Sequence, residues 1–212
     1  MKPDPAVEWV RPFNPSQIPQ TRTRTALSPI SCPLDIEIGC GVGWHPIAYA
    51  RKHPNRYLVA IEHTAEKFEK FARRLRRNPA ARNLLAVHAN AISWITHEVT
   101  TQSVDRYFLL YPNPYPKAKQ RNQRWHAMPF MERLIATLKP GGELILATNL
   151  PAYAEEAEDL LVQHWGLIPA RKRLLMLPTL PEGFPRTHFE KKYLEAGQIC
   201  FDLVFRKPTL IP

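Results

Sequence analysis

The sequence predicts an α/β fold in which a mainly parallel sheet of seven strands has helices on both faces. Five short apolar runs alternate with segments of helical spacing, which is the pattern of repeated strand-helix-strand units. Two further apolar runs follow one another near the C-terminus and predict an antiparallel pair that closes the sheet. A glycine cluster at residues 39–43 stands between the first run and a helical segment, where sheets of this kind bind ligands.

Seven apolar runs are expected to form the strands. In chain order they cover residues 34–39, 57–62, 84–89, 106–111, 143–148, 171–178 and 198–207. Gly141 and Gly142 are expected to end one helix and to begin the fifth strand. No clear helical spacing separates the sixth and seventh runs, so the sequence predicts no helix between them.

The clearest predicted helix covers residues 64–79. Its apolar face consists of Phe68, Phe71 and Leu75. Thr64 is a suitable N-cap, and Pro79 closes the run. Arginines occupy the other positions of the segment RRLRR, and we expect them to lie far from any substrate and to serve solubility.

We expect one domain at residues 34–212, preceded by an N-terminal arm at residues 1–33. Apolar residues make up 44% and charged residues 23% of the 212 residues, which suits a soluble protein with a full core. The proline-rich arm shows no periodicity and is expected to be partly extended. No run of about 18 apolar residues exists, which excludes a membrane-spanning helix. The start of the chain lacks an apolar signal core, so we expect a cytoplasmic protein.

The cysteines and histidines predict neither a disulfide nor a metal site. Cys32, Cys40 and Cys200 are an odd number without metal-type spacing, which favours reduced thiols. The eight histidines form no H-x-x-H or H-E-x-x-H pair, so no bound metal is expected. Cys40 in the glycine cluster is expected to be a small buried residue rather than a nucleophile.

The net charge of +10 favours a polyanionic partner such as nucleic acid or a membrane surface. Basic residues gather at three places: Arg22 and Arg24 in the arm, residues 117–124 after the fourth run, and residues 171–173. A run of charges is often a solvated face, but clusters near a base pocket favour RNA. Contacts of such clusters with phosphates would make affinity fall steeply with salt.

The glycine cluster has the setting of a cofactor site. Gly39, Gly41 and Gly43 follow a strand and precede a helix, where a ligand can approach the backbone at the helix N-terminus. Glu62 ends the second run about 20 residues later, where a carboxylate accepts hydrogen bonds from ribose hydroxyls. This combination favours an adenosine-type cofactor. The alternative is a tight turn beside a surface glutamate.

The spacing G-x-G-x-G, preceded by Glu37, resembles the first motif of class I S-adenosylmethionine-dependent methyltransferases. A dinucleotide site prefers G-x-G-x-x-G, whose third glycine would fall at Trp44. The resemblance implies that the loop wraps the methionine part of S-adenosylmethionine and that Glu62 binds its ribose. It also implies that Asn90 or Ala91, after the third strand, meets the adenine.

The segment YPNPYPKAKQRNQRW, at residues 111–125, is a proline-rich aromatic corner followed by basic side chains. Proline fixes its own φ and pushes the preceding residue into an extended conformation. Asn113 and Tyr115 should therefore be held in narrow ranges of backbone geometry. A corner this stiff at the end of the fourth strand predicts the wall of a binding pocket.

Three motifs, in order, are similar to those of the bacterial tRNA (guanine-N7)-methyltransferase family. The corner keeps the prolines and Lys117 of the F-P-D-P-W-P-K motif, and LKPGGELILATN is similar to L-K-P-G-G-x-x-x-x-x-T-D. Near the end, RTHFEKKYLEAG matches T-x-F-E-x-K before a glycine. The resemblance covers the chain from about residue 34 to residue 206.

This resemblance implies a class I methyltransferase domain that uses S-adenosylmethionine, releases S-adenosylhomocysteine and methylates N7 of a variable-loop guanine in tRNA. Guanine N7 is already nucleophilic, so orientation and a dry pocket matter more than a general base. The residues implied in catalysis are Asn113 and Lys117. Those implied in substrate binding are Tyr115, Thr148, Asn149, Thr187 and Glu190. Thr187 and Glu190 would hold the guanine N1–H and exocyclic amine, and Tyr115 would pack against the base.

Three positions depart from the family pattern: Asn113 and Asn149 replace aspartates, and Tyr115 replaces a tryptophan. Asparagine keeps an acceptor oxygen but loses the charge and adds a donor. Three functions therefore remain open: a divergent tRNA methyltransferase, a methyltransferase that acts on a different and possibly small acceptor, and a non-catalytic RNA-binding relative. The sequence leaves both a monomer and a homodimer open.

Overall fold

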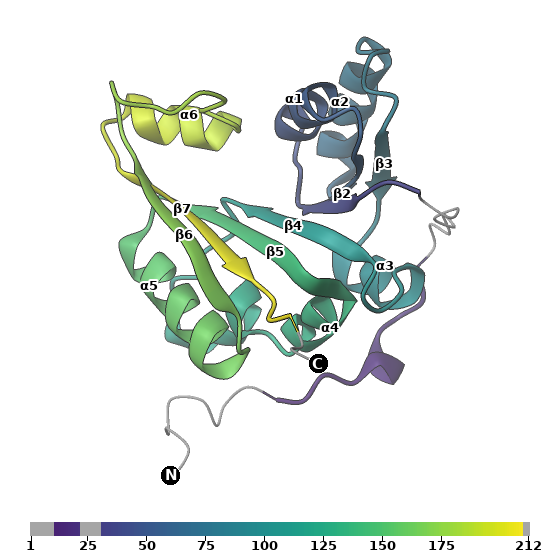
Figure 1. Ribbon diagram of the computed structural model, residues 1–212, viewed down its shortest axis with the longest axis vertical. Helices are drawn as coiled ribbons and strands as arrows, with labels where there is room; N and C mark the ends of the chain where they lie inside the picture. The colour runs from purple at the N-terminus through teal and green to yellow at the C-terminus, as the bar shows by residue number, and fades with distance from the viewer. Residues whose placement is uncertain (1–10, 22–30, 210–212) are drawn as a thin grey trace.

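The computed structural model describes residues 11–21 and 31–209, and a seven-stranded sheet is its framework (Figure 1). The strands are β1 (Leu34–Ile38), β2 (Tyr57–Glu62), β3 (Leu84–His88), β4 (Val104–Leu110), β5 (Leu138–Thr148), β6 (Ile168–Leu175) and β7 (Cys200–Arg206). The helices are α1 (Trp44–Lys52), α2 (Ala65–Arg76), α3 (Ala91–Glu98), α4 (Phe130–Thr137), α5 (Pro151–Asp159) and α6 (His188–Glu195). Shorter helical turns are η1 (Pro15–Gln17), η2 (Ala118–Gln123), η3 (Trp125–Ala127) and η4 (Leu160–His164).

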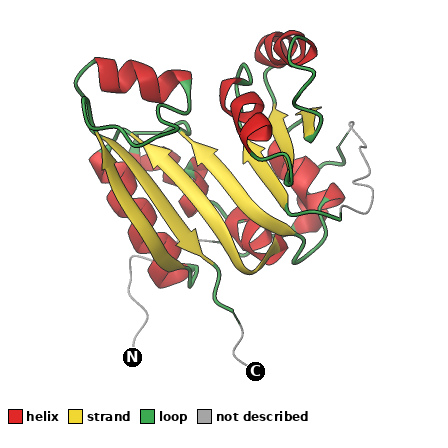
Figure 2. Ribbon diagram, turned by 45° about the horizontal axis from the view of Figure 1, so that its top comes forward, coloured by secondary structure: helices red, strands yellow, loops and turns green. Residues whose placement is uncertain are grey.

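The strands lie in the order β3-β2-β1-β4-β5-β7-β6. Strands β1 to β5 pair in parallel, whereas β7 runs antiparallel to both of its neighbours. The predicted mainly parallel sheet with an antiparallel C-terminal pair is confirmed. The carboxyl ends of β1 to β5 meet at one edge, where open α/β sheets bind their ligands (Figure 2).

Helices cover both faces of the sheet, because successive side chains of each strand point to opposite faces. On one face, Ile36 of β1 packs into a core that includes Trp94 of α3 and Met131 of α4. On the other face, Leu58 of β2 packs into a second core with Phe71 of α2. The two cores fix α1 and α2 on one side of the sheet and α3, α4 and α5 on the other.

Helix α2 confirms the helix predicted from residue 64 onward. Phe71 is fully buried against the sheet, and Phe68 and Leu75 are half-buried beside it. Thr64 stands at the N-cap position, but its side chain makes no capping hydrogen bond. Its backbone N–H donates instead to the carboxylate of Glu62, at 2.7 Å.

Helix α6 corrects the expectation of no helix between the last two strands. Its start is a capping arrangement in which the Thr187 hydroxyl accepts the N–H of Glu190, at 3.0 Å. Its end is a Schellman motif at Gly197, where Gln198 N donates to Tyr193 O, at 2.9 Å. Both signals are local, but the helix has only eight residues, too few for its spacing to stand out.

The Gly141-Gly142 pair does not end a helix, which corrects a second expectation. Helix α4 ends at Thr137, and β5 begins before the glycines, at Leu138. Gly141 has φ +76°, and its N–H donates to Lys207 O, at 2.9 Å. A Cβ at Gly142 would stand only 2.9 Å from the Lys139 carbonyl oxygen, so the close backbone approach needs glycine.

The described part of the N-terminal arm packs against α3 and α4. Phe13 lies edge-on to Phe130 with ring centroids 5.7 Å apart, and its N–H donates to Glu132, at 3.1 Å. His97 of α3 contacts the carbonyl oxygen of Ile18, at 3.1 Å. The arginine cluster predicted at residues 22 and 24 lies outside the described residues.

Among residues 11–21 and 31–209, no helix is long and apolar enough to cross a membrane. No group of three or more histidine, cysteine or acidic side chains in this part of the chain is placed to hold a metal ion. Cys32, Cys40 and Cys200 are free thiols.

Candidate functional site

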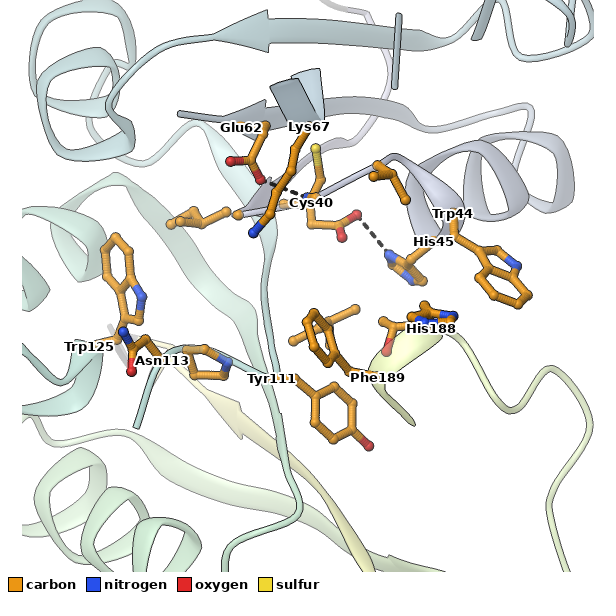
Figure 3. A pocket seen from close by; sticks show the side chains of 18 of the residues that line it. Cys40, Trp44, His45, Glu62, Lys67, Tyr111, Asn113, Trp125, His188 and Phe189 are labelled. Carbon is orange, nitrogen blue, oxygen red and sulfur yellow. Dashed lines mark hydrogen bonds and ion pairs between the residues drawn. The ribbon is translucent and has the colours of Figure 1, made fainter. Parts of the chain in front are cut away.

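A cavity of about 540 Å³ opens at the carboxyl edge of the sheet, between the loop after β1 and helix α6 (Figure 3). Its walls come from the glycine loop with the start of α1, from the β2–α2 connection, from the proline corner and from α6. The predicted site residues that line it are Glu37, Gly39, Gly41, Glu62, Asn113 and Thr187. The volume is that of a small-molecule site.

Two of the three predicted loop glycines present bare backbone to the cavity. Gly39 and Gly41 have φ +74° and +59°, and a Cβ added at either would meet open space. Gly43 is different, because a Cβ there would lie 1.9 Å from the ring of Phe71. Gly43 is thus required for the packing of α1 on α2 and does not line the cavity, and its predicted contact with the cofactor stays a prediction.

Glu62 holds the glycine loop and the start of α2 together. Its carboxylate accepts the N–H of Gly41, at 2.8 Å, and the N–H of Thr64, at 2.7 Å. The side chain is 6% exposed but lines the cavity from the end of β2. Lys67 extends from the first turn of α2 toward the same space (Figure 3). Sequence reasoning did not identify Lys67.

Glu37 forms a buried pair with His45 beneath the loop. Its carboxylate lies 2.8 Å from Nδ1 of His45, and both side chains are almost fully buried (Figure 3). His45 comes from the first turn of α1, eight residues later, so the pair fixes the loop between them. The sequence pointed to Glu37 but not to His45, because a histidine in a helix gives no signal of its partner.

Asn90 and Ala91 lie beside this site without lining the cavity. They follow β3, and Ala89 N donates to Glu62 O, at 3.2 Å, which places the segment next to the end of β2. The Asn90 side chain caps α3 by accepting the N–H of Ile92, at 2.9 Å, and that of Ser93, at 3.2 Å. Their predicted contact with adenine stays a prediction.

The proline corner has a different backbone from the one predicted. Tyr111 and Tyr115 have φ +54° and +44°, although each precedes a proline and should be extended. Asn113 lines the cavity, and its side-chain oxygen accepts the N–H of Tyr115, at 3.3 Å. The Asn113 amide nitrogen has no partner among the described residues. Tyr115 does not line the cavity, whereas Tyr111 does.

Arg124 clamps the corner to helix α5. Its guanidinium donates twice to the carbonyl oxygen of Tyr115, at 3.2 and 3.0 Å, and pairs with Glu156. Arg121 also donates to Glu156, at 2.6 Å, and the buried His126 lies 3.1 Å from it. Burial raises the pKa of Glu156, but these hydrogen bonds outweigh that effect and lower it to about 2.

Three further predicted residues, Lys117, Thr148 and Asn149, also lie outside the cavity. Lys117 is exposed at the start of η2. Thr148 is buried at the end of β5, where its hydroxyl accepts the N–H of Leu150, at 3.2 Å. Asn149 donates to the side chain of Gln198, at 2.8 Å, and so ties β5 to the segment after α6.

Glu190 is buried and does not line the cavity, so its predicted contact with guanine stays a prediction. It is fully buried, and it accepts the Tyr111 hydroxyl, at 2.9 Å, and groups of Arg186. Arg186 also pairs with the buried Asp202, at 2.8 Å. Burial and the Glu190 carboxylate raise the pKa of the Tyr111 hydroxyl, which therefore remains a donor. Thr187 lines the cavity and caps α6.

Aromatic side chains surround the cavity on both sides of its mouth. They are Trp44, Tyr111, Trp125, His188, Phe189 and Tyr193. Trp44 from α1 faces His188 from α6, with ring centroids 6.0 Å apart (Figure 3). Trp44 and Phe189 are 39% and 49% exposed, which is high for such large rings. The sequence did not predict this set, because its members come together only in the fold.

Comparison with known proteins agrees with the sequence motifs. A family model described as "Putative methyltransferase" matches residues 31–203. The chain is 30% identical over 194 residues to the tRNA (guanine-N(7)-)-methyltransferase of Nitrosomonas eutropha, covering 92% of this chain and 82% of that protein. It is 30% identical over 180 residues to the protein of the same name from Nitrosospira multiformis, covering 84% and 76%.

A solved structure of similar fold is a 16S rRNA (adenine(1408)-N(1))-methyltransferase variant from Catenulisporales acidiphilia with its cosubstrate SAM. It has a TM-score of 0.60 and 17% identity, and the match covers 85% of this chain and 88% of that one. This likeness confirms the predicted class I methyltransferase fold. The motifs, the sheet order and the family match agree. The chain therefore belongs to the methyltransferase family whose model matches residues 31–203, and proteins named tRNA (guanine-N(7)-)-methyltransferase are among its relatives.

Proposed function

We propose that the protein uses S-adenosylmethionine to methylate N7 of a guanine in tRNA. The observation that supports this most is the cavity itself, in which the glycine loop with Glu62 faces the proline corner and α6. The glycine loop and Glu62 suit a cofactor, and the proline corner and α6 suit an acceptor base. The names of the relatives and the net charge of +10 support tRNA as the source of that base.

The residues present fit S-adenosylmethionine. Gly39 and Gly41 leave open space above their backbone, and the cavity is large enough for a nucleoside with an amino acid tail. Under this proposal the loop holds the methionine part and Glu62 the ribose. Glu37 lies beneath the loop, where a buried carboxylate would attract an ammonium group.

The proposed reaction asks the protein for orientation rather than for a base. S-adenosylmethionine, when bound, supplies an electrophilic methyl group on a sulfonium. The lone pair of guanine N7 forms the new bond, the methyl–sulfur bond breaks, and the positive charge moves to the guanine ring. No proton leaves N7, so no side chain has to accept one. The corner and α6 would exclude water and set the approach.

Asn113 is proposed to bind the guanine beside the reacting atom. Its amide nitrogen is free among the described residues, and guanine presents O6 as an acceptor next to N7. An aspartate at this position could only accept, whereas asparagine can donate to O6. Tyr115 does not line the cavity, whereas Tyr111 and Phe189 do, so the packing against the base is proposed for one of these two rings. Stacking on such a ring is worth roughly 1–3 kcal/mol per base.

Methyl transfer to RNA can be tested directly. Purified protein, methyl-labelled S-adenosylmethionine and unmodified tRNA transcripts are incubated at low salt, with a 16S rRNA transcript as the matched acceptor. The RNA is then digested and its nucleosides are separated by mass. We expect labelled 7-methylguanosine from tRNA and none from rRNA. Label in rRNA alone would contradict the proposed substrate.

A second candidate is a methyltransferase with a different, small acceptor. The burial of Glu190 favours it, because the predicted partner of the guanine N1–H is then unavailable. In that case S-adenosylhomocysteine would still raise the melting temperature, while no RNA would be labelled. Absence of both label and thermal shift would favour a non-catalytic RNA-binding relative.

A further inference from the structure

A groove between α1 and α2 lies beside the cavity, and Trp44 borders both. It holds about 380 Å³ and is lined by Trp44, Ile47, Ala48, Arg51, Arg74 and Asn78. Trp44 lines both the groove and the main cavity, so its side chain lies between the two spaces. In Figure 3 its ring stands at the rim beside His188. A chain-like ligand whose tip entered the cavity could continue into this groove.

The groove is positively charged. Arg51 and Arg74 are exposed on facing helices, and neither forms an ion pair within the described part of the chain. Other arginines of the fold are neutralised: Arg56 pairs with Asp35, and Arg106 with Glu143. The two groove arginines thus remain available to an anion from outside. Arginine is well suited to phosphate, which its planar guanidinium can contact with two hydrogen bonds.

We propose that this groove binds the RNA backbone next to the nucleotide whose base enters the cavity. Arg51 and Arg74 contact phosphates there, and the exposed Trp44 ring packs against a neighbouring base. The proposal rests on the proposed function insofar as it takes the cavity as the site of the target base. It extends that function by assigning the path of the strand that leaves the site.

The side chains that line the groove favour RNA over an anionic membrane. Ile47 is only 5% exposed, so Trp44, at 39%, is the large apolar side chain that remains available to a ligand. A single ring between two arginines offers one stacking surface beside two phosphate-binding groups. A phosphodiester strand with stacked bases suits such a groove, because it offers both charge and ring faces.

The arginines of α2 therefore do not form one equivalent set. Arg74 borders the groove beside α1, whereas Arg73 and Arg76 border a separate hollow with Phe68, Glu69 and Ala72. The role in solubility predicted for all of them therefore does not extend to Arg74 under this proposal. The fold separates Arg74 from its neighbours in sequence, because residues one or two apart on a helix face different directions.

This difference provides a charge-matched experiment. One double variant, Arg51→Gln with Arg74→Gln, removes two charges from the groove. The control, Arg73→Gln with Arg76→Gln, removes two charges from the other side of α2. Equilibrium binding of tRNA is measured at several salt concentrations, together with kcat and KM for methyl transfer. Thermal shifts with S-adenosylhomocysteine confirm that both variants are folded and bind the cofactor.

We expect the groove variant to bind tRNA about tenfold more weakly at low salt. The slope of its log affinity against log salt concentration should correspond to about two fewer released counterions than in the wild type. Its KM for tRNA should rise with little change in kcat, and the control should stay near wild type. Equal effects in the two variants, or no effect in either, would show that the groove does not bind the RNA backbone. This result would not bear on the proposed methyl transfer by the wild type.

The two proposals fail in distinguishable ways. If the wild type labels no tRNA but the groove variant still loses tRNA binding selectively, the groove stands and the proposed function falls. If the wild type does not bind tRNA, or if the groove arginines mediate binding only to anionic phospholipid vesicles, the groove proposal is wrong.

Discussion

Arg124 holds the carbonyl oxygen of Tyr115 with two hydrogen bonds, at 3.2 and 3.0 Å, although nine residues separate them. Tyr115 has φ +44°, a conformation that costs a non-glycine residue roughly 1–2 kcal/mol. The clamp offsets this strain and fixes the corner that carries Asn113. Glu156 in turn fixes the guanidinium, so helix α5 determines the shape of a wall that it does not line.

Substitution of the clamp should slow methyl transfer without abolishing cofactor binding. In Arg124→Lys the ammonium cannot donate a fork of hydrogen bonds to Tyr115 and also pair with Glu156. We expect kcat to fall about tenfold to a hundredfold, because the corner loses its position, while the affinity for S-adenosylhomocysteine is retained. Lys119→Gln, in the exposed part of the same basic segment, is the control. Similar rates for the two variants would show that the clamp has no role in positioning.

Glu156 should make the fold sensitive to acid. Its pKa in the folded state is about 2, below the ordinary value of 4.5. The ionised carboxylate therefore stabilises the fold fully above about pH 4.5, and this contribution is lost as the pH falls toward 2. In urea unfolding, wild type and Glu156→Gln should differ most near neutral pH and converge across that range. A difference that stays constant from neutral to acid would contradict this account.

Glu190→Gln should act through stability. The carboxylate is fully buried with Tyr111 and Arg186, and its loss leaves charged or polar groups unpaired, which costs about 1–3 kcal/mol. Tyr111→Phe removes only the hydroxyl and should cost less. Melting temperatures measure both effects. If Glu190→Gln instead melted like the wild type but lost methyl transfer to tRNA, Glu190 would contact guanine after a rearrangement of α6.

Gly41 and Gly43 lie close in sequence but differ in role, and alanine substitutions distinguish the two roles. Gly41→Ala places a methyl group in the open cavity and should weaken S-adenosylhomocysteine binding, with a destabilisation of only about 1–2 kcal/mol from its positive φ. Gly43→Ala drives a methyl group into Phe71 and should lower stability by more. Calorimetry and thermal melting distinguish the two effects. Equal losses of affinity and stability in both variants would contradict the assignment.

Local patterns predicted the sheet and the side of the cavity that the glycine loop and Glu62 form. Each strand, and the loop after the first strand, shows its own pattern within a few residues, and Glu62 stands at the end of a strand, so short-range rules suffice for them. Short-range rules do not predict the role of Gly43, because that role depends on Phe71, which contacts it only after α2 packs on the sheet.

The side of the cavity formed by the proline corner and α6 could not be predicted in the same way, because long-range contacts determine it. The rule for residues before proline gave an extended Tyr115, and the clamp from Arg124 overrides it. Glu190 looked available in sequence, but Tyr111 and Arg186 enclose it in the fold. The rim formed by Trp44 and His188 joins segments more than a hundred residues apart in the chain.

Guanine N7 is the proposed methyl acceptor, and replacement of that single atom tests this role. Two tRNA transcripts are compared, one ordinary and one in which 7-deazaguanosine replaces guanosine, so that a C–H group stands in place of N7. With methyl-labelled S-adenosylmethionine, we predict labelled 7-methylguanosine in the ordinary transcript and no label in the other, although both compete for binding. Equal labelling of the two transcripts, or none in ordinary tRNA, would contradict the claim.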